Sequence, residues 1–158
     1  MDDAPVPLDG VDRRLLDALV TDARTSVHAL AARANVSRST AYQRLNRLQE
    51  SGIIRRFTVD LDARRLGLPI AALVLANVDQ HSWRSAADRV RQLPGVEWIG
   101  ITTGPSDFVV LVRAPDVDHL RDVVLTGFQA IPEIRSTQSL FLLDEMSSEG
   151  GRLGALPD

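Results

Sequence analysis

The side chains best suited to chemistry in this sequence are arginines, gathered in one stretch of an otherwise acidic chain. The 158 residues include 18 basic and 21 acidic side chains, which gives a net charge of −3. Between Arg33 and Arg56, however, six arginines accompany a single acid, Glu50, so the local charge is +5. Because phosphate attraction depends on local rather than total charge, this block favours nucleic-acid binding by one module. A solvated helical face is the alternative interpretation.

The same stretch contains a predicted helix whose polar side could contact base edges. Its apolar residues Ala41, Leu45 and Leu48 should face a core, which leaves a polar face on the opposite side. Glutamine pairs with adenine, serine and threonine bond several base edges, and arginine binds guanine or phosphate. The side chains that we expect to contact DNA are Ser37, Arg38, Ser39, Thr40, Gln43, Arg44, Arg47, Arg55 and Arg56. An ordinary polar face used for protein contacts is the alternative, whereas RNA is disfavoured because no aromatic pair lies on a candidate strand.

A turn over residues 102–107, Thr-Thr-Gly-Pro-Ser-Asp, offers a second group of polar side chains. Glycine, proline, serine and aspartate are the usual turn formers, so a plain hairpin connection would explain the segment by itself. A functional interpretation makes the same residues a pocket for a zwitterionic amino acid. Backbone amides near Gly104 would then donate to the ligand carboxylate, and Asp107 would bind its ammonium group.

Residues for catalysis or metal binding follow no pattern that we can assign. His28, His81 and His119 are scattered and cysteine is absent, so neither a zinc site nor a thiol nucleophile is expected. The phosphate-binding pattern G-x-G-x-x-G and the nucleophile pattern G-x-S-x-G are both missing. We therefore expect no enzyme activity, no metal and no cofactor, although a fold alone does not exclude catalysis.

The hydropathy of the chain predicts no membrane segment. The longest unbroken apolar run, residues 70–76, is far shorter than the roughly 20 residues that a membrane-spanning helix needs. The first residues, Met-Asp-Asp-Ala-Pro, are acidic and lack the apolar segment of a secretory signal. We therefore expect a cytoplasmic location.

Helices must position the polar face described above, and the first third of the chain has helical spacing throughout. Capping residues mark three helix starts: Asp9 with Asp12 three positions later, Ser26, and Ser37. After the third helix, the β-branched and aromatic residues of segment 53–59 predict a strand. Three helices and a strand make a winged helix-turn-helix module.

After residue 69 the pattern changes to strand, helix, strand, twice over. Strands are predicted at residues 70–78, 96–102, 108–112 and 134–143, and helices at 83–90 and 117–128. Two such units joined by a hairpin make a ferredoxin-like sandwich, with both helices on one face of a four-stranded antiparallel sheet. The first and third strands are continuously apolar, so both of their faces should be buried. Another copy of the chain is the economical cover for the second face, which predicts a two-fold homodimer.

The chain is therefore expected to belong to the α+β class, as a winged helix-turn-helix followed by a ferredoxin-like βαββαβ sandwich. The predicted parts are a DNA-binding domain over residues 8–59, a linker over 60–69, an effector-binding and dimerisation domain over 70–143 and a flexible tail over 144–158. The first few residues are expected to be equally loose.

Several motifs, in this order, resemble the Lrp/AsnC transcriptional regulators. The motifs are Leu8–Leu16, Asp22–Arg24, Leu30–Ala31 with Val36–Ser37, Arg44–Leu48, Gly52–Ile54, Gly104–Phe108 and Ile134–Leu143. The resemblance implies a bacterial or archaeal protein that binds double-stranded DNA and regulates transcription. It also implies a ferredoxin-like domain that oligomerises and commonly responds to amino acids.

The resemblance further implies an effector pocket between subunits. The candidate residues are Thr102, Gly104, Ser106, Asp107, Thr137 and Ser139. Ser106 stands where the family usually has tyrosine, and Ser139 follows Thr137 where a threonine pair is typical, so the class of effector stays open. It is equally open whether dimers assemble further into rings. An amino-acid-sensing regulatory subunit that acts by protein contacts is the alternative function.

Overall fold

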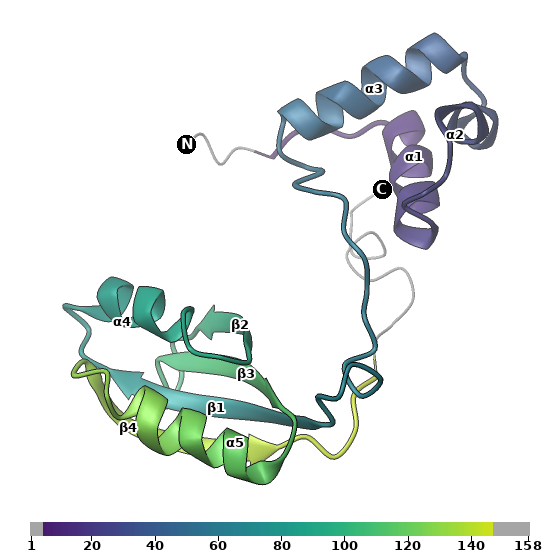
Figure 1. Ribbon diagram of the computed structural model, residues 1–158. Coiled ribbons are helices and arrows are strands. Elements are labelled where there is room, and N and C mark those ends of the chain that lie inside the picture. The colour runs from purple at the N-terminus through teal and green to yellow at the C-terminus, as the bar shows by residue number, and fades with distance from the viewer. Residues whose placement is uncertain (1–4, 147–158) are drawn as a thin grey trace. The chain divides into compact units, whose positions relative to one another are not determined.

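The computed structural model describes residues 5–146 (Figure 1). These residues form two compact units. Of the described residues, 5–60 belong to one unit, and the other unit spans Leu61–Glu145. Of the tail predicted to be flexible, residues 147–158 lie outside the described residues, as do residues 1–4. Over the described part, no helix is both long enough and apolar enough to cross a membrane.

Within residues 5–60 the chain forms three helices, at the predicted positions. They are α1 (Gly10–Thr21), α2 (Val27–Ala34) and α3 (Arg38–Glu50). Asp9 and Asp12 form a reciprocal capping box at the start of α1, in which each carboxylate accepts the backbone N–H of the other residue. The Ser26 hydroxyl accepts the Ala29 N–H and the Ser37 hydroxyl accepts the Thr40 N–H, so all three predicted caps are confirmed.

The turn between α2 and α3 is a tight connection of three residues. Asn35 ends α2 in the left-handed region, with φ 56°, which asparagine tolerates better than most residues. The Val36 N–H then donates to the Ala31 carbonyl over 3.0 Å. Ala34 and Ala41 on either side of this turn are fully buried, and their small side chains let the two helices approach closely around Leu30. This packing holds α3 as the second helix of a helix-turn-helix.

The predicted strand at residues 53–59 is wrong. After Gly52, at φ 75°, the Ile54 N–H donates back to the Leu48 carbonyl, and the chain then runs on without pairing to another strand. Phe57 and Val59 are 52% and 72% exposed. Strand propensity needs a partner edge to form a ladder, and residues 5–60 contain no second strand to supply one. Residues 53–59, which were predicted to form the strand of the winged helix-turn-helix, are therefore a segment without strand pairing.

Over residues 61–145 the chain forms the predicted ferredoxin-like sandwich. The strands are β1 (Ile70–Val78), β2 (Val96–Ile101), β3 (Phe108–Ala114) and β4 (Ile134–Phe141). They form one antiparallel sheet in the order β2-β3-β1-β4. The connecting helices are α4 (Trp83–Val90) and α5 (Val117–Asp122), and α5 continues directly into a π-helix, η1 (Val123–Phe128).

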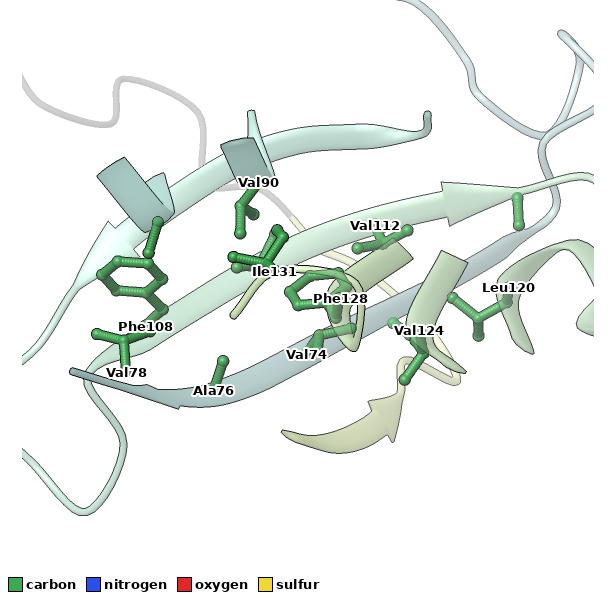
Figure 2. Packing of buried hydrophobic residues seen from close by; sticks show 14 residues of the cluster. Val74, Ala76, Val78, Val90, Phe108, Val112, Leu120, Val124, Phe128 and Ile131 are labelled. Atoms are coloured by element: carbon green, nitrogen blue, oxygen red, sulfur yellow. The ribbon is translucent and has the colours of Figure 1, made fainter. Parts of the chain in front are cut away.

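Both helical segments pack on the same face of this sheet. Alternate residues of the two central strands point into one core, including Val74 from β1 and Val112 from β3, both fully buried. Figure 2 shows Val90 of α4 and Phe128 of η1 reaching this core from the helical side.

Within residues 61–145, no helix covers the other face of the sheet. Leu73 and Leu75 of β1 and Leu111 of β3 lie on this face and are only partly buried, and Trp98 of β2 is 54% exposed beside them. Leu140 of β4 pairs with Leu73 and extends the same surface. We call these residues the open sheet face. The two faces therefore differ within one chain, although the strand sequences are apolar on both.

Candidate functional sites

The exposed face of α3 combines small hydroxyl groups with an amide side chain. Ser39 and Gln43 are exposed, whereas Thr40 is half-buried. The Ser37 hydroxyl lies 2.9 Å from that of Ser39 and 2.8 Å from that of Thr40, so the three side chains form one hydrogen-bonded cluster at the start of the helix. Ser39 and Gln43 lie one helical turn apart and can contact neighbouring base pairs in a major groove.

Arg44 and Arg47 lie on the flank of α3, where they bind the capping box of α1. The Arg44 Nη1 atom lies 2.6 Å from Asp9 Oδ2 and 3.2 Å from Asp12 Oδ2, and Arg47 pairs with the same Asp12 oxygen. Asp12 is fully buried. Because each guanidinium forms an ion pair with a carboxylate at the start of α1, both arginines hold α3 against α1, whether or not they also contact DNA.

The charges in this cluster change how its groups titrate. The backbone N–H of Asp12 and the Arg44 guanidinium stabilise the Asp9 carboxylate, which lowers its pKa from 3.8 to about 2. The same hydrogen bond with Asp9 raises the pKa of Arg44. Asp9 and Arg44 lie 35 residues apart in the sequence, so helical spacing alone did not predict that they form a pair.

The remaining predicted arginines point away from such partners. Arg38, Arg55 and Arg56 are exposed, and within residues 5–146 no hydrogen bond or ion pair engages their side chains. Arg38 begins α3, while the other two follow it in the unpaired segment. These three cations are available for phosphate or base contacts.

Tyr42 is a further candidate that the sequence reasoning missed. It lies one turn after Arg38 on α3, and its side chain is 58% exposed. Together with Val27, Arg38 and Ser39 it lines a hollow of about 440 Å³. The available signal was an aromatic residue within a helix face that is otherwise polar, because an exposed aromatic ring offers an apolar surface and a hydroxyl together.

A second hollow, of about 480 Å³, lies beside the β2–β3 hairpin. It is lined by Val78, Gln80, Trp83, Ile101, Thr102, Thr103, Gly104, Asp107 and Phe108. We call it the hairpin pocket. Three of the six predicted effector residues, Thr102, Gly104 and Asp107, line it. Gln80 and Trp83 were missed, the latter because its place in an apolar helix stripe indicated only a core role.

Hydrogen bonds within the hairpin use several of the groups expected to bind a ligand. The Asp107 Oδ2 atom accepts the Val78 N–H over 2.9 Å. The Thr102 hydroxyl donates to the Ser106 carbonyl and accepts the Gly104 N–H over 3.3 Å. The Gly104 amide is therefore engaged inside the turn, and the described contacts of the Asp107 side chain use one of its two oxygens.

The other predicted effector residues do not line the hairpin pocket. Ser106 belongs to the hairpin itself, and its carbonyl binds Thr102. Thr137 and Ser139 lie on β4, at the sheet edge opposite β2, where they pair with Ala76 and Val74 of β1. One chain thus divides the six predicted residues between two regions. Across the part of the chain that the structure describes, no group of three or more acidic, histidine or cysteine side chains could hold a metal ion.

Known protein families match both units of the chain. The AsnC-type helix-turn-helix domain matches residues 8–49, and the Lrp/AsnC ligand binding domain matches residues 71–151. The regulator AldR of Mycobacterium tuberculosis is 32% identical over 145 residues, which cover 90% of this chain and 81% of AldR. An uncharacterised helix-turn-helix regulator of Pyrococcus abyssi is also 32% identical, over 90% of this chain and 97% of its own length.

Solved structures give the same result. AsnC of E. coli superposes with a TM-score of 0.83 at 28% identity, covering 90% of this chain and 98% of AsnC. A transcriptional regulator of Neisseria meningitidis, solved as a complex with L-methionine, superposes with a TM-score of 0.85 at 24% identity and covers 96% of this chain and 97% of that one. At this identity, the likeness to the Neisseria regulator shows a shared fold.

Proposed function

We propose a mode of action for this chain, which belongs to the Lrp/AsnC family of helix-turn-helix transcriptional regulators. In this proposal α3 enters the major groove of double-stranded DNA and its exposed polar face contacts base edges. The observation that carries the proposal is the exposure of Ser39 and Gln43 beside the unpaired Arg38. Arg55 and Arg56 supply phosphate contacts.

We further propose that Arg44 and Arg47 mainly position α3. Both guanidinium groups bind carboxylates of α1, which favours an orienting role over direct base contact. Ser37 and Thr40 act in the same way, since the Ser37 hydroxyl caps the helix at the Thr40 N–H and Thr40 is half-buried. Ser39, Gln43 and Arg38 are left as the residues that discriminate between sequences.

The hairpin pocket is the proposed site for a small amino-acid effector. Asp107 lies in its wall with one oxygen outside its bond to Val78, so it can accept a hydrogen bond from a ligand ammonium group. Trp83 and Ile101 supply apolar surface for a side chain. Thr137 and Ser139 take part only if a neighbouring subunit brings its β4 to this pocket. The L-methionine complex of the Neisseria regulator supports an amino acid as the class of effector.

The open sheet face is the proposed dimer interface, because it presents leucines from three strands and Trp98 without a helix to cover them. Sedimentation equilibrium measures whether the dimers assemble further into rings. No catalytic role is proposed, and a cytoplasmic location is expected for a regulator that contacts DNA.

Selection of bound fragments from the source genome, with and without each of the twenty amino acids, tests the proposals on DNA binding and on the effector. We expect one set of related DNA sites to be enriched and at least one amino acid to change the enrichment. If no DNA is retained under any condition, the alternative function as a regulatory subunit acting by protein contacts is favoured instead.

A further inference from the structure

A further hollow of the second unit lies at the other end of the sheet from the hairpin pocket. It measures about 710 Å³ and is lined by Leu68, Pro94, Gly95, Arg113, Ala114, Pro115, His119, Asp122, Val123, Thr126 and Gly127. We call it the π-helix pocket. No residue lines both pockets. The strand β3 runs from Phe108 in the hairpin pocket to Ala114 in this one, a path of roughly 20 Å at about 3.4 Å per residue.

On one side of this pocket, the backbone of the turn before β2 lies very close to the backbone of β3. Gly95 has φ 77°, and a Cβ atom there would lie 2.1 Å from the Arg113 carbonyl oxygen. The Arg113 N–H also donates to the Gly95 carbonyl over 2.8 Å. Only glycine therefore allows the strand and the turn before β2 to approach this closely. The wall that they form is rigid.

The opposite wall is the π-helix itself. Val123, Thr126 and Gly127 belong to η1 and all line the pocket. A π-helix is wider than an α-helix and less favourable, and such segments occur frequently at functional sites. A Cβ atom at Gly127 would lie 3.0 Å from the Leu93 side chain, so the glycine also keeps this wall close to the neighbouring element.

The polar groups of the pocket favour a positively charged ligand. Its one guanidinium, on Arg113, is bound by Glu97 over 2.5 Å and by Glu145 over 2.7 Å, so two carboxylates already offset its positive charge. Asp122 is exposed on the rim, where its described contact is a long bond of 3.4 Å from Arg121. Its charge also adds to the effect of Asp116 in raising the pKa of His119, but the described hydrogen bond of that ring goes to Asp116. Asp122 is therefore the carboxylate of the lining that a ligand can reach.

The surrounding charges act in the same direction. Four carboxylates lie on the pocket or contact its lining, against Arg113, Arg121 and His119. The four are Asp116, Asp122, Glu97 and Glu145. The hydrogen bond with Asp116 raises the pKa of His119, and the local charge stays negative even when His119 is protonated. The apolar part of the wall, from Leu68, Pro94, Pro115 and Val123, suits a hydrocarbon or aromatic body.

We propose that the π-helix pocket binds a small organic cation, an amine with an apolar or aromatic body. The ammonium group lies at Asp122, and the body lies between Pro94, Pro115 and Val123. The site is separate from the hairpin pocket, and the proposal does not depend on DNA binding.

The experiment uses the full chain and 2-phenylethylamine as the probe, with phenylacetate as the matched anion. Amide resonances of glycines report the location, because Gly95 and Gly127 line this pocket and Gly104 lines the other. We expect 2-phenylethylamine to shift Gly95 and Gly127 and to leave Gly104 in place, while phenylacetate shifts none of them. Asp122→Asn should weaken binding about tenfold, the size of one lost charge-assisted bond.

Two further variants complete the test. Asp118→Asn removes an equally exposed carboxylate from the same helix, outside the pocket lining, and should change the affinity less than twofold. Thr126→Leu places a larger side chain on the wall and should abolish binding without removing a charge. The proposal is overturned if phenylacetate binds as tightly as the amine, if both aspartate variants lose the same affinity, if only Gly104 shifts, or if no resonance moves.

Discussion

Arg44 and Arg47 illustrate why a local excess of arginine does not by itself identify DNA contacts. Six arginines lie between residues 33 and 56, yet these two bind Asp9 and Asp12 of the same unit. Internal pairing lowers the positive charge that the module presents to DNA. The side chains without such partners, among them Gln43 and Arg56, are therefore the better places to measure DNA contact.

Gln43 and Arg56 should have different effects when each is replaced by alanine. Gln43→Ala should cost about 1 to 3 kcal/mol at the operator and hardly change the affinity for unrelated DNA, because a base contact is lost. Arg56→Ala should weaken binding to all sequences and lower the slope of log affinity against log salt by about 1, because a phosphate contact is lost. Fluorescence anisotropy at several salt concentrations measures both. Unchanged operator affinity for variants at Arg38, Gln43 and Ser39 alike would contradict the placement of α3.

Tyr42 tests whether an aromatic ring on α3 also contacts DNA. Tyr42→Ala should weaken operator binding by roughly fivefold to tenfold, the size of a single lost base contact. Tyr42→Phe keeps the apolar ring and should bind within about twofold of the natural protein if the ring makes the contact. The same anisotropy assay compares the two variants. If Tyr42→Ala binds operator normally, the hollow beside it has no part in DNA recognition.

At the scale of whole elements, the cluster of Asp9, Asp12, Arg44 and Arg47 joins α1 to α3 and makes this packing sensitive to acid. The folded pKa of Asp9 is about 2, below its ordinary value of 3.8. Its contribution to stability is therefore fully present above about pH 4 and is lost as the pH falls toward 2. The difference in unfolding free energy between the natural protein and Asp9→Asn should shrink across this window.

Urea unfolding followed by circular dichroism, repeated at several pH values, measures that difference. Asp17→Asn serves as the control, because Asp17 is exposed on α1 and lies outside the cluster. The change in its difference from the natural protein over the same range is the reference for the Asp9→Asn result. A gap for Asp9→Asn that does not change between pH 4 and pH 2 would mean that the negative charge of Asp9, beside the Asp12 N–H and the Arg44 guanidinium, does not stabilise the folded unit.

The helix starts could be predicted from the sequence, whereas the elements that depend on distant partners could not. Asp9, Ser26 and Ser37 cap helices through bonds to residues at most three positions away, so local sequence was sufficient. Segment 53–59 has strand composition, but a ladder needs a partner edge, and local composition does not report one.

The candidate sites could be predicted in part for the same reason. Periodicity identified the exposed face of α3, and turn composition identified the hairpin that lines one pocket. The ion pair between Asp9 and Arg44 joins segments that are distant in sequence, so local patterns did not predict it. The π-helix after Asp122 is a widening of the helix that has no residue signature. Thr137 and Ser139 were grouped with Asp107 by resemblance, and strand order separates them within one chain.

The hairpin gives a prediction that separates a ligand contact from a structural one. Asp107→Asn keeps an oxygen that can accept the Val78 N–H and removes the charge for an ammonium group. It should abolish the rise in melting temperature caused by an amino-acid effector while leaving the fold intact. Asp107→Ala also loses the bond to Val78 and should cost about 1 kcal/mol more in unfolding free energy.

Thermal unfolding with each amino acid in turn, and then calorimetry with the best one, provides the measurement. An effector that changes DNA affinity must bind with an affinity that DNA changes by the same factor, so the calorimetry is repeated with operator present. If Asp107→Asn keeps the full ligand-induced shift, the ammonium lies elsewhere. If no amino acid produces heat under either condition, the hairpin is only a turn.

At the scale of the whole molecule, assembly depends on the open sheet face. Successive residues of a strand point to opposite faces, so Val110 and Leu111 of β3 offer a matched pair one position apart. Val110 is fully buried in the helical core, while Leu111 lies on the open sheet face. A charge at Val110 should unfold the second unit, because an unpaired carboxylate in an apolar core is costly.

A charge at Leu111 should instead separate the subunits and leave each one folded. Sedimentation equilibrium at micromolar concentration should give dimers or larger for the natural protein and monomers for Leu111→Asp, with circular dichroism unchanged. Because a two-fold dimer presents two copies of α3, its operator should be an imperfect palindrome, and the monomeric variant should protect only one half-site with reduced affinity. A footprint of the natural protein without an inverted repeat would argue against the dimer, and a Leu111→Asp variant that still sediments as a dimer would place the interface on another surface.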